Sequence, residues 1–155
     1  MKKAFTMVEL IFVIVIIGIL AAVAIPKLAG TRDDAKISAM VENARKALGD
    51  IQAYYYAQSN VVWRTATVDQ ATNVSFDETN CGNPVTSTTQ LSPTTFILCH
   101  DNVICVSFET IDEGNLTIAD GTVTTDPICE VVKAEEAIIA ISNQEYQLGG
   151  KKVER

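Results

Sequence analysis

The sequence predicts an α+β protein in which one long N-terminal helix packs on a small antiparallel sheet. The first observation is an uncharged apolar run from Leu10 to Ile25 that continues directly into a segment with apolar residues at helical spacing. The second is a series of short β-branched and aromatic segments in the C-terminal part, separated by turn sequences. At 155 residues the chain is long enough for one folded unit and too short for several.

The predicted helix runs from Phe5 to Tyr56 and has two different halves. Residues 5–25 are apolar on every side, whereas the second half combines an apolar stripe with a polar face. The stripe consists of Ile37, Met40, Val41, Ala44, Ala47, Leu48, Ile51 and Tyr54 or Tyr55. Pro26 removes a backbone donor and predicts a bend, and Gly18 and Pro26 bracket a stretch of low helical stability.

Residues 5–25 are long enough to span a membrane. At ~1.5 Å per residue their helix matches a hydrocarbon core of roughly 30 Å. Lys2 and Lys3 precede this segment and nearly all of the chain follows it. The positive-inside rule therefore predicts a single pass through the inner membrane, with the N-terminus cytoplasmic and residues 26–155 exported to the periplasm.

A cleaved secretory signal peptide is the alternative interpretation of the N-terminus, with Ala22-Val23-Ala24 as its cleavage site. It fits less well because Glu9 is acidic where such a peptide is neutral or basic. The helical pattern also continues past Pro26 without a turn signal. The sequence therefore favours a retained anchor.

Charge divides the chain near the end of the apolar run. The whole chain has a formal net charge of −7 and residues 1–32 carry +3, which leaves −10 on residues 33–155. Such an acidic part repels nucleic acid, and it lacks the basic patches that nucleic-acid binding requires. The sequence therefore predicts no nucleic-acid partner for the globular part.

The N-terminus also carries an ordered motif, Lys2-Lys3-Ala4-Phe5-Thr6-Met7-Val8-Glu9-Leu10, followed by the apolar run and Pro26. It resembles the N-terminal signal of type IV pilins and of the pseudopilins of type II secretion systems. The resemblance implies that a prepilin peptidase cuts between Ala4 and Phe5 and methylates the new amine of Phe5. Residues 1–4 are then a leader peptide, and residues 5–25 are first a transmembrane helix and later the filament core.

Glu9 becomes the fifth mature residue, which this family fills with glutamate, whereas Ala4 stands where the family prefers glycine. Cleavage creates an α-amine at Phe5 that is cationic at neutral pH, one helical turn from Glu9. A buried charge without a partner is penalised by several kcal/mol, so Glu9 pairs with this amine within the chain or with that of a neighbouring subunit. The resemblance implies the second pairing and an assembly role, while a shallow, solvated Glu9 is the simpler interpretation.

The sequence after the long helix predicts a loop, a sheet and a short helix. Residues 60–95 are rich in Thr, Ser and Asn and predict a surface connection with one strand over residues 61–63. Strands over residues 95–99 and 103–108 flank a three-residue turn. A second hairpin is predicted over residues 116–124 around Asp120-Gly121, a type I′ turn signal.

The C-terminal segment begins with a helix start signal. Asp126-Pro127 provides an N-cap and a first-turn proline for a helix that ends near Ile141. Residues 146–153 around Gly149-Gly150 predict a closing hairpin. A single antiparallel sheet packed on the amphipathic half of the long helix would bury both apolar faces, and the pilin resemblance implies the same layout.

All four cysteines, Cys81, Cys99, Cys105 and Cys129, lie on the side predicted to be exported. Their spacing offers no zinc pattern, and an oxidising periplasm favours disulfides over free thiols. Three pairings exist. In a hairpin with a three-residue turn Cys99 and Cys105 are offset, so we favour Cys81–Cys99 with Cys105–Cys129 and leave the other pairings open.

The sequence offers little that would support catalysis or metal binding. His100 is the only histidine and lies in a predicted turn, so no Ser/His pair or zinc site forms around it. Predicted loops contain the acidic residues Asp112, Glu113, Asp120 and Asp126. Their spacing is not that of an EF-hand, which favours a solvated surface over a calcium site. We therefore expect no enzyme, no cofactor and no metal.

One short motif stands apart from these features. Residues Glu113-Gly114-Asn115-Leu116-Thr117 resemble the extended acidic sequon of bacterial N-glycosylation. Short motifs recur by chance, so glycosylation at Asn115 is a hypothesis that an intact-mass measurement tests.

The favoured function is a structural subunit, a pilin or pseudopilin that polymerises through its apolar helix into a type IV pilus or a type II secretion pseudopilus. Its expected partners are the prepilin peptidase, other subunits and the inner membrane. The alternative is a monomeric, membrane-tethered periplasmic binding or adhesion module. A periplasmic enzyme released after Ala24 is a third interpretation, for which the sequence shows no catalytic constellation.

Overall fold

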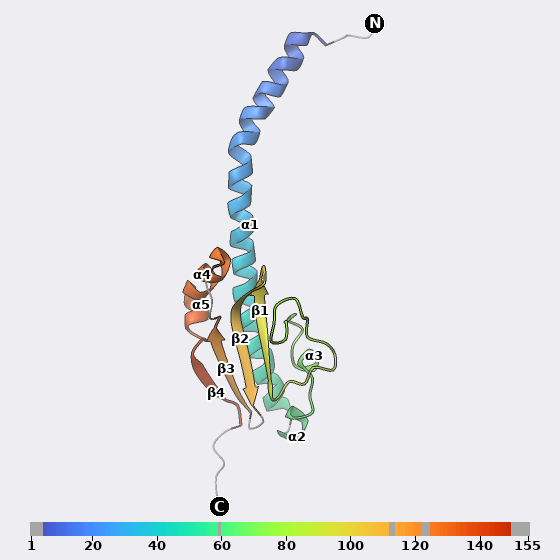
Figure 1. Ribbon diagram of the computed structural model, residues 1–155, viewed down its shortest axis with the longest axis vertical. Helices are drawn as coiled ribbons and strands as arrows, with labels where there is room; N and C mark the ends of the chain where they lie inside the picture. Colours follow the sequence, from blue (N-terminus) through green and yellow to red (C-terminus); the bar gives the residue numbers. More distant parts are fainter. Residues whose placement is uncertain (1–4, 59, 112–113, 122–124, 150–155) are drawn as a thin grey trace, which may run out of the picture. The chain divides into compact units, whose positions relative to one another are not determined.

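The computed structural model describes residues 5–58, 60–111, 114–121 and 125–149. The chain divides into two compact units, Met1–Lys36 and Ile37–Arg155. The elements in chain order are α1 (Met7–Ala57), α2 (Asn60–Trp63), α3 (Val68–Ala71), β1 (Thr94–His100), β2 (Val103–Ile111), β3 (Asn115–Asp120), α4 (Pro127–Ala134), α5 (Glu136–Ile139) and β4 (Gln144–Gln147) (Figure 1). The predicted α+β layout of one long N-terminal helix with a small antiparallel sheet is confirmed.

Helix α1 is continuous over both of its predicted halves. It runs through Gly18 and Pro26 without a break, and within the first unit its ribbon curves (Figure 1). In the second unit α1 buries one stripe, made of Ala44, Ala47, Leu48 and Ile51. These residues are three or four positions apart along the chain, the spacing that places side chains on one helix face.

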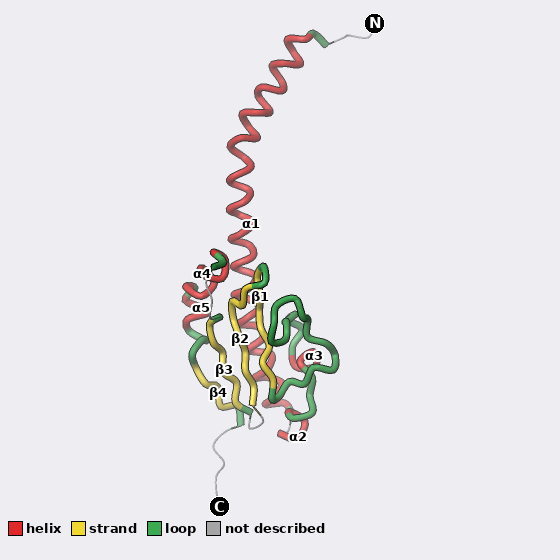
Figure 2. The backbone as a smooth tube through the Cα atoms, viewed as in Figure 1, coloured by secondary structure: helices red, strands yellow, loops and turns green. Residues whose placement is uncertain are grey.

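The sheet has the strand order β1-β2-β3-β4, with every neighbouring pair antiparallel (Figure 2). One of its faces packs against the buried stripe of α1 in a single apolar core. Phe96 of β1 and Phe108 of β2 are directly paired, and their rings stack with centroids 5.5 Å apart. Phe76 packs edge-on against Phe96 at 4.9 Å, so the loop before the sheet also contributes to the core.

The turn between β1 and β2 is shorter than predicted. His100 pairs with Val103, so the turn has two central residues, Asp101 at φ 43° and Asn102 at φ 68°. Positive φ at both positions is the signature of a type I′ turn, and Asn and Asp tolerate it. The predicted three-residue turn is wrong because it counted His100 as part of the turn. Leu98 pairs with Val106 and Cys99 with Ile104, so the register shifts by one residue and Cys105 has no partner in β1, as in a β-bulge.

Strand β3 does not end in the predicted type I′ hairpin. Neither Asp120 nor Gly121 has a positive φ, and the N–H of Gly121 donates to the carbonyl of Cys105 at 3.0 Å. Glycine is needed here for a different reason, since a Cβ on Gly121 would lie 1.6 Å from the carbonyl oxygen of Ile104. The strand predicted over residues 122–124 lies outside the described residues.

The partner of β3 on its other edge is β4, which follows two short helices. Asp126 caps α4 as predicted, but the helix ends at Ala134 because Glu135 is extended, and α5 begins one residue later. Tyr146 of β4 pairs with Leu116 of β3. The second arm of the closing hairpin predicted around Gly149-Gly150 falls on residues 150–153, outside the described residues.

The predictions for residues 60–95 are wrong in two respects. Residues 60–63 form α2 rather than a strand, and the segment is not a mere surface connection, because Trp63, Val68 and Leu91 are almost completely buried. The indole N–H of Trp63 donates to the carbonyl of Ile111 at 3.3 Å. Burial of the indole fixes the local backbone, and such tertiary packing overrides the weak β propensity of a short Val-Val-Trp run.

Candidate functional site

The N-terminus of α1 is closed by a reciprocal pair, Thr6 and Glu9. The backbone N–H and the hydroxyl of Thr6 both donate to Oε2 of Glu9, each at 2.8 Å. The N–H of Glu9 donates in return to the Thr6 hydroxyl at 3.3 Å. This arrangement is a capping box, which satisfies helix N–H groups that have no carbonyl partner within the helix.

The capping box fixes where the Glu9 carboxylate lies. It turns the carboxylate back toward the start of α1, the end where the helix dipole favours negative charge. Both hydrogen bonds from Thr6 go to Oε2, one of the two carboxylate oxygens of Glu9. Phe5, the residue predicted to become the mature N-terminus, precedes the helix and is 86% exposed. Sequence reasoning missed the role of Thr6, although the Thr-x-x-Glu spacing is the readable signal of a capping box.

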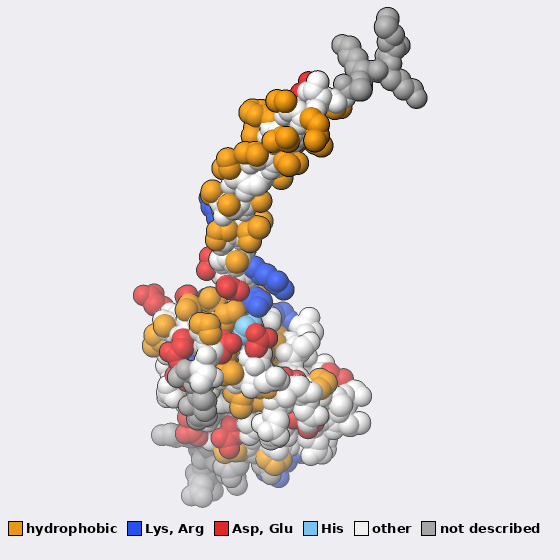
Figure 3. Space-filling view, turned by 45° about the horizontal axis from the view of Figure 1, so that its top comes forward, with side chains coloured by type: hydrophobic (Ala, Val, Ile, Leu, Met, Phe, Trp, Pro, Cys, Tyr) orange, Lys and Arg blue, Asp and Glu red, His pale blue; other side chains and the backbone are white. Residues whose placement is uncertain are grey.

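The first unit exposes an unusually apolar helix surface. Every large apolar side chain from Phe5 to Leu28 is exposed, from 39% at Ile16 to 86% at Phe5. Figure 3 shows apolar side chains along this part of α1. By length and composition α1 contains a stretch able to cross a membrane, and none of that stretch is buried. Continuous apolar surface of this kind marks a membrane or protein contact.

The other residues predicted for processing and flexibility are placed as follows. Ala4, the residue before the predicted cut, lies outside the described residues. Gly18 lies within α1 with open space around it, and Pro26 lies within the same helix. Their role as points of flexibility stays a prediction.

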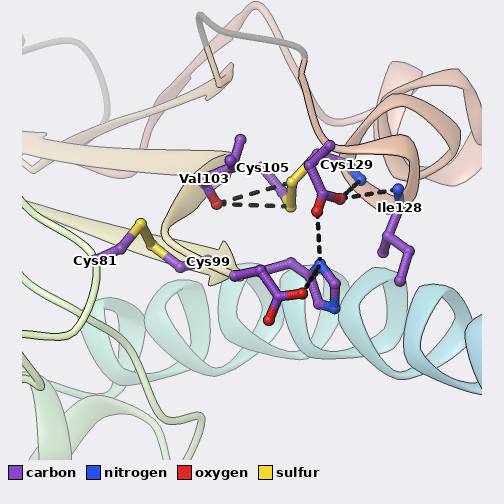
Figure 4. The surroundings of a disulfide bond; sticks show 9 residues. Cys81, Cys99, Val103, Cys105, Ile128 and Cys129 are labelled. Atoms are coloured by element: carbon purple, nitrogen blue, oxygen red, sulfur yellow. Dashed lines mark hydrogen bonds and ion pairs between the residues drawn. A yellow bond between two sulfur atoms is a disulfide. The ribbon is translucent and has the colours of Figure 1, made fainter.

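The four cysteines form two disulfides in the second unit (Figure 4). Cys81 is joined to Cys99 and Cys105 to Cys129, the pairing that the sequence favoured. The first bond ties the loop before the sheet to β1, and the second ties β2 to α4. Cys105 and Cys129 are fully buried, whereas Cys81 and Cys99 are only half-buried.

His100 does more than occupy a turn. Its Nδ1 lies 3.0 Å from Oδ2 of Asp126 and 3.8 Å from Oδ2 of Asp101. Oδ1 of Asp126 meanwhile accepts the N–H groups of Ile128 and Cys129, both at 2.9 Å. These backbone bonds, chiefly that of Cys129, and the contact with His100 hold the pKa of Asp126 below its ordinary value. The sequence indicated the cap but not the histidine, which lies 26 positions earlier.

The acidic residues considered for calcium do not form one group among the described residues. Asp120 is bound by the amide of Asn143 at 3.4 Å, and Asp126 is the cap of α4. Asp112 and Glu113 lie outside the described residues. His100, Asp101 and Asp126 are close enough to share an ion, but Asp126 already accepts two backbone N–H groups. The three side chains are explained by fastening α4 to the sheet.

A long N-terminal helix whose first half is apolar and exposed, and whose second half packs on a small antiparallel sheet, is the layout of a pilin-like protein. Residues 1–25 match the family model described as the prokaryotic N-terminal methylation motif. The chain therefore carries the signal of type IV pilins and pseudopilins, proteins that are structural subunits. Searches of curated proteins and of solved structures found no match.

Proposed function

We propose that this chain is a filament subunit, cut by a prepilin peptidase between Ala4 and Phe5 and N-methylated at Phe5. In this proposal residues 1–4 are a leader, residues 5–25 cross the inner membrane and then form the filament core, and residues 26–155 are exported. The subunit builds a type IV pilus or a type II secretion pseudopilus. Its role is structural rather than catalytic.

The observation that carries the proposal is the exposed apolar half of α1. A single helix with apolar side chains on every side is stable in lipid but not in water. After extraction from the membrane, it needs the same surface of other subunits to cover it. Copies that repeat one such non-closing contact form an open helical assembly, which is a filament.

The capping box supports a specific role for Glu9 in this assembly. Carboxylates within an apolar layer are costly unless they are paired. Thr6 already holds one oxygen of Glu9, which fixes the position of the carboxylate before any partner arrives. A preset carboxylate near the mature N-terminus selects the axial position at which a neighbouring amine neutralises it.

The N-terminus of the mature protein tests the processing step. The full chain is produced in cells that contain a prepilin peptidase, extracted in detergent, and analysed by intact mass and by its N-terminal peptide. The expected peptide begins with N-methylated Phe5. A protein that begins at Met1 or at Ile25 would contradict the proposal, the latter in favour of release by signal peptidase.

A pair of variants tests the assembly step in cells that carry the assembly machinery. Glu9→Ala is expected to abolish filaments recovered by shearing, while processing at Phe5 continues. Thr6→Val should reduce their yield and Thr6→Ser should restore it, because serine retains the hydroxyl. Glu42→Ala, an exposed glutamate farther along α1, is the matched control and should leave the yield unchanged. Unchanged yield in Glu9→Ala would instead favour the tethered, monomeric module.

A further inference from the structure

We propose that Asn115, the first residue of β3, is an N-glycosylation site that accepts an oligosaccharide from a lipid diphosphate donor. The proposal rests on the export of the second unit, which belongs to the proposed function. It concerns a different part of the molecule from the N-terminal helix. Asn115-Leu116-Thr117 is an Asn-x-Thr acceptor sequence, and an acidic residue stands two positions before the asparagine in the chain.

Strand geometry places both recognition side chains of the sequon on the outer face of the sheet. Successive side chains of a strand point to opposite faces. Leu116 and Ile118 are fully buried against the core, so Asn115 and Thr117 point the other way and are partly exposed. A sugar on Asn115 would extend from this outer face and displace no core residue.

The neighbours of the sequon leave this face accessible. Asn115 pairs with Gln147 of β4 and with Ile111 of β2, and both of these side chains are exposed. Thr117 pairs with Glu109 and Glu145, which are exposed as well. The strands β2, β3 and β4 lie side by side in Figure 1. Asn115 is the first residue of β3.

The side-chain amide of Asn115 is held in a way that tolerates the modification. Its Nδ2 donates to Oε1 of Glu145 at 2.6 Å. An asparagine Nδ2 carries two hydrogens, and this bond uses one of them. N-glycosylation replaces the other hydrogen, so the bond to Glu145 persists and orients the glycan-bearing amide on the finished sheet.

The transfer step balances without an oxidant or reductant. A bond forms between Nδ2 of Asn115 and the anomeric carbon of the donor. The bond between that carbon and the diphosphate oxygen breaks, and its electron pair leaves with the lipid diphosphate. The proton lost from Nδ2 goes to a base of the transferase and then to water.

A second Asn-x-Ser/Thr sequence in the chain provides an internal comparison. Asn73 and Ser75 are also exposed, but the residue two positions before Asn73 is Ala71 rather than an acid. The Oδ1 of Asn73 accepts a hydrogen bond from Nζ of Lys46. A transferase that requires the acidic residue should therefore modify Asn115 and leave Asn73 unmodified.

The first test is an acceptor assay on the purified full chain in detergent. A bacterial oligosaccharyltransferase that requires an acidic sequon is supplied with a lipid-linked oligosaccharide of known mass, and a short acceptor peptide in the same reaction proves that the enzyme is active. The second test co-produces the same components in cells, so that transfer can occur during export. The N-terminal peptide from these cells reports processing at Phe5 separately.

The expected result in at least one test is a gain of one oligosaccharide mass on the full chain, located at Asn115. Asn115→Gln and Thr117→Ala should lose the gain completely, whereas Thr117→Ser and the matched control Asn73→Gln should keep it. Absence of a mass gain in both tests while the acceptor peptide is modified would overturn the proposal. A glycan on Asn73 but not on Asn115 would overturn it too. Failure at Phe5 with a glycan at Asn115 would instead count against the filament function.

Discussion

Nδ1 of His100 lies 3.0 Å from Oδ2 of Asp126, and this contact joins the end of β1 to the N-cap of α4. The two side chains are largely buried, at 14% and 11% exposed. Asp126 thereby serves two partners with its two oxygens, the helix N–H groups and the imidazole. Together with the Cys105–Cys129 disulfide, the pair fastens α4 to the sheet at two points.

The first prediction concerns the acid stability of this fastening. The pKa of Asp126 is lowered from its ordinary 3.8, first by the N–H of Cys129 and then by His100. A lowered folded-state pKa means stability that is present above the unfolded value and is lost as the pH falls through the folded value. Asp126→Ala should cost about 1 kcal/mol at neutral pH because the cap is lost.

Urea unfolding of the full chain in detergent, at about pH 6 and about pH 3, measures this dependence. Asp126→Asn retains a capping oxygen and removes the titrating charge, so its stability should fall less on acidification than that of the parent chain. Asp101→Asn is the control, because Asp101 is 81% exposed and lies 3.8 Å from the same nitrogen. An equal pH dependence in the parent and in Asp126→Asn would refute the assignment.

The second prediction contrasts two glycines. A Cβ on Gly121 would lie 1.6 Å from the carbonyl oxygen of Ile104. The backbone at Gly121 or at Ile104 must therefore move to admit it. Gly121→Ala should therefore cost about 3 kcal/mol or more. Gly49 lies in α1 with open space around it, so Gly49→Ala should stabilise the chain by up to about 1 kcal/mol. Thermal unfolding of both variants tests the pair, and a loss of stability in Gly49→Ala would show that the helix face at Gly49 is not open.

Local patterns explain what could be predicted from the sequence. Three features depend only on residues that are close together in the sequence. They are the stripe from Ala44 to Ile51, the strand segments around Phe96 and Phe108, and the cap at Asp126. The N-terminal motif is equally local, because its signal lies in consecutive residues. For these features the periodicity and the turn chemistry were sufficient.

The features that could not be predicted depend on contacts between distant residues. Trp63 is helical because its indole is buried and bound to Ile111, 48 positions away. Strand β3 pairs with β4, from which two helices separate it in the chain. Gly121 looked like a turn glycine, yet it is needed for a close approach to Ile104 that only the packed sheet creates.

The third prediction is that the two disulfides differ in accessibility. Cys105 and Cys129 are fully buried, whereas Cys81 and Cys99 are half-buried. A thiolate must reach a sulfur to attack it, so a water-soluble dithiol should reduce Cys81–Cys99 first under native conditions. Alkylation followed by peptide mass analysis measures the order. Simultaneous loss of both bonds would mean that reduction proceeds through global unfolding.

The fourth prediction uses Trp63, the only tryptophan of the chain. The indole is fully buried, packs edge-on against Tyr55 with ring centroids 5.0 Å apart, and donates to the carbonyl of Ile111 at 3.3 Å. Truncation to alanine removes this packing and leaves a cavity between α1, α2 and the end of β2. Trp63→Ala should therefore cost about 3–5 kcal/mol.

Trp63→Phe separates the hydrogen bond from the packing. It retains most of the apolar contact and removes the indole donor from the Ile111 carbonyl, which still accepts the N–H of Gly114 at 3.0 Å. It should therefore cost less than the alanine variant, about 0.5–1.5 kcal/mol. The unfolding of both variants is followed by far-ultraviolet circular dichroism, since the fluorophore is gone, and that of the parent chain by tryptophan emission as well. Tyr56→Ala is the control, because Tyr56 is 70% exposed and its loss should change stability little. Equal stability of Trp63→Ala and the parent chain would contradict the burial of the indole in the core.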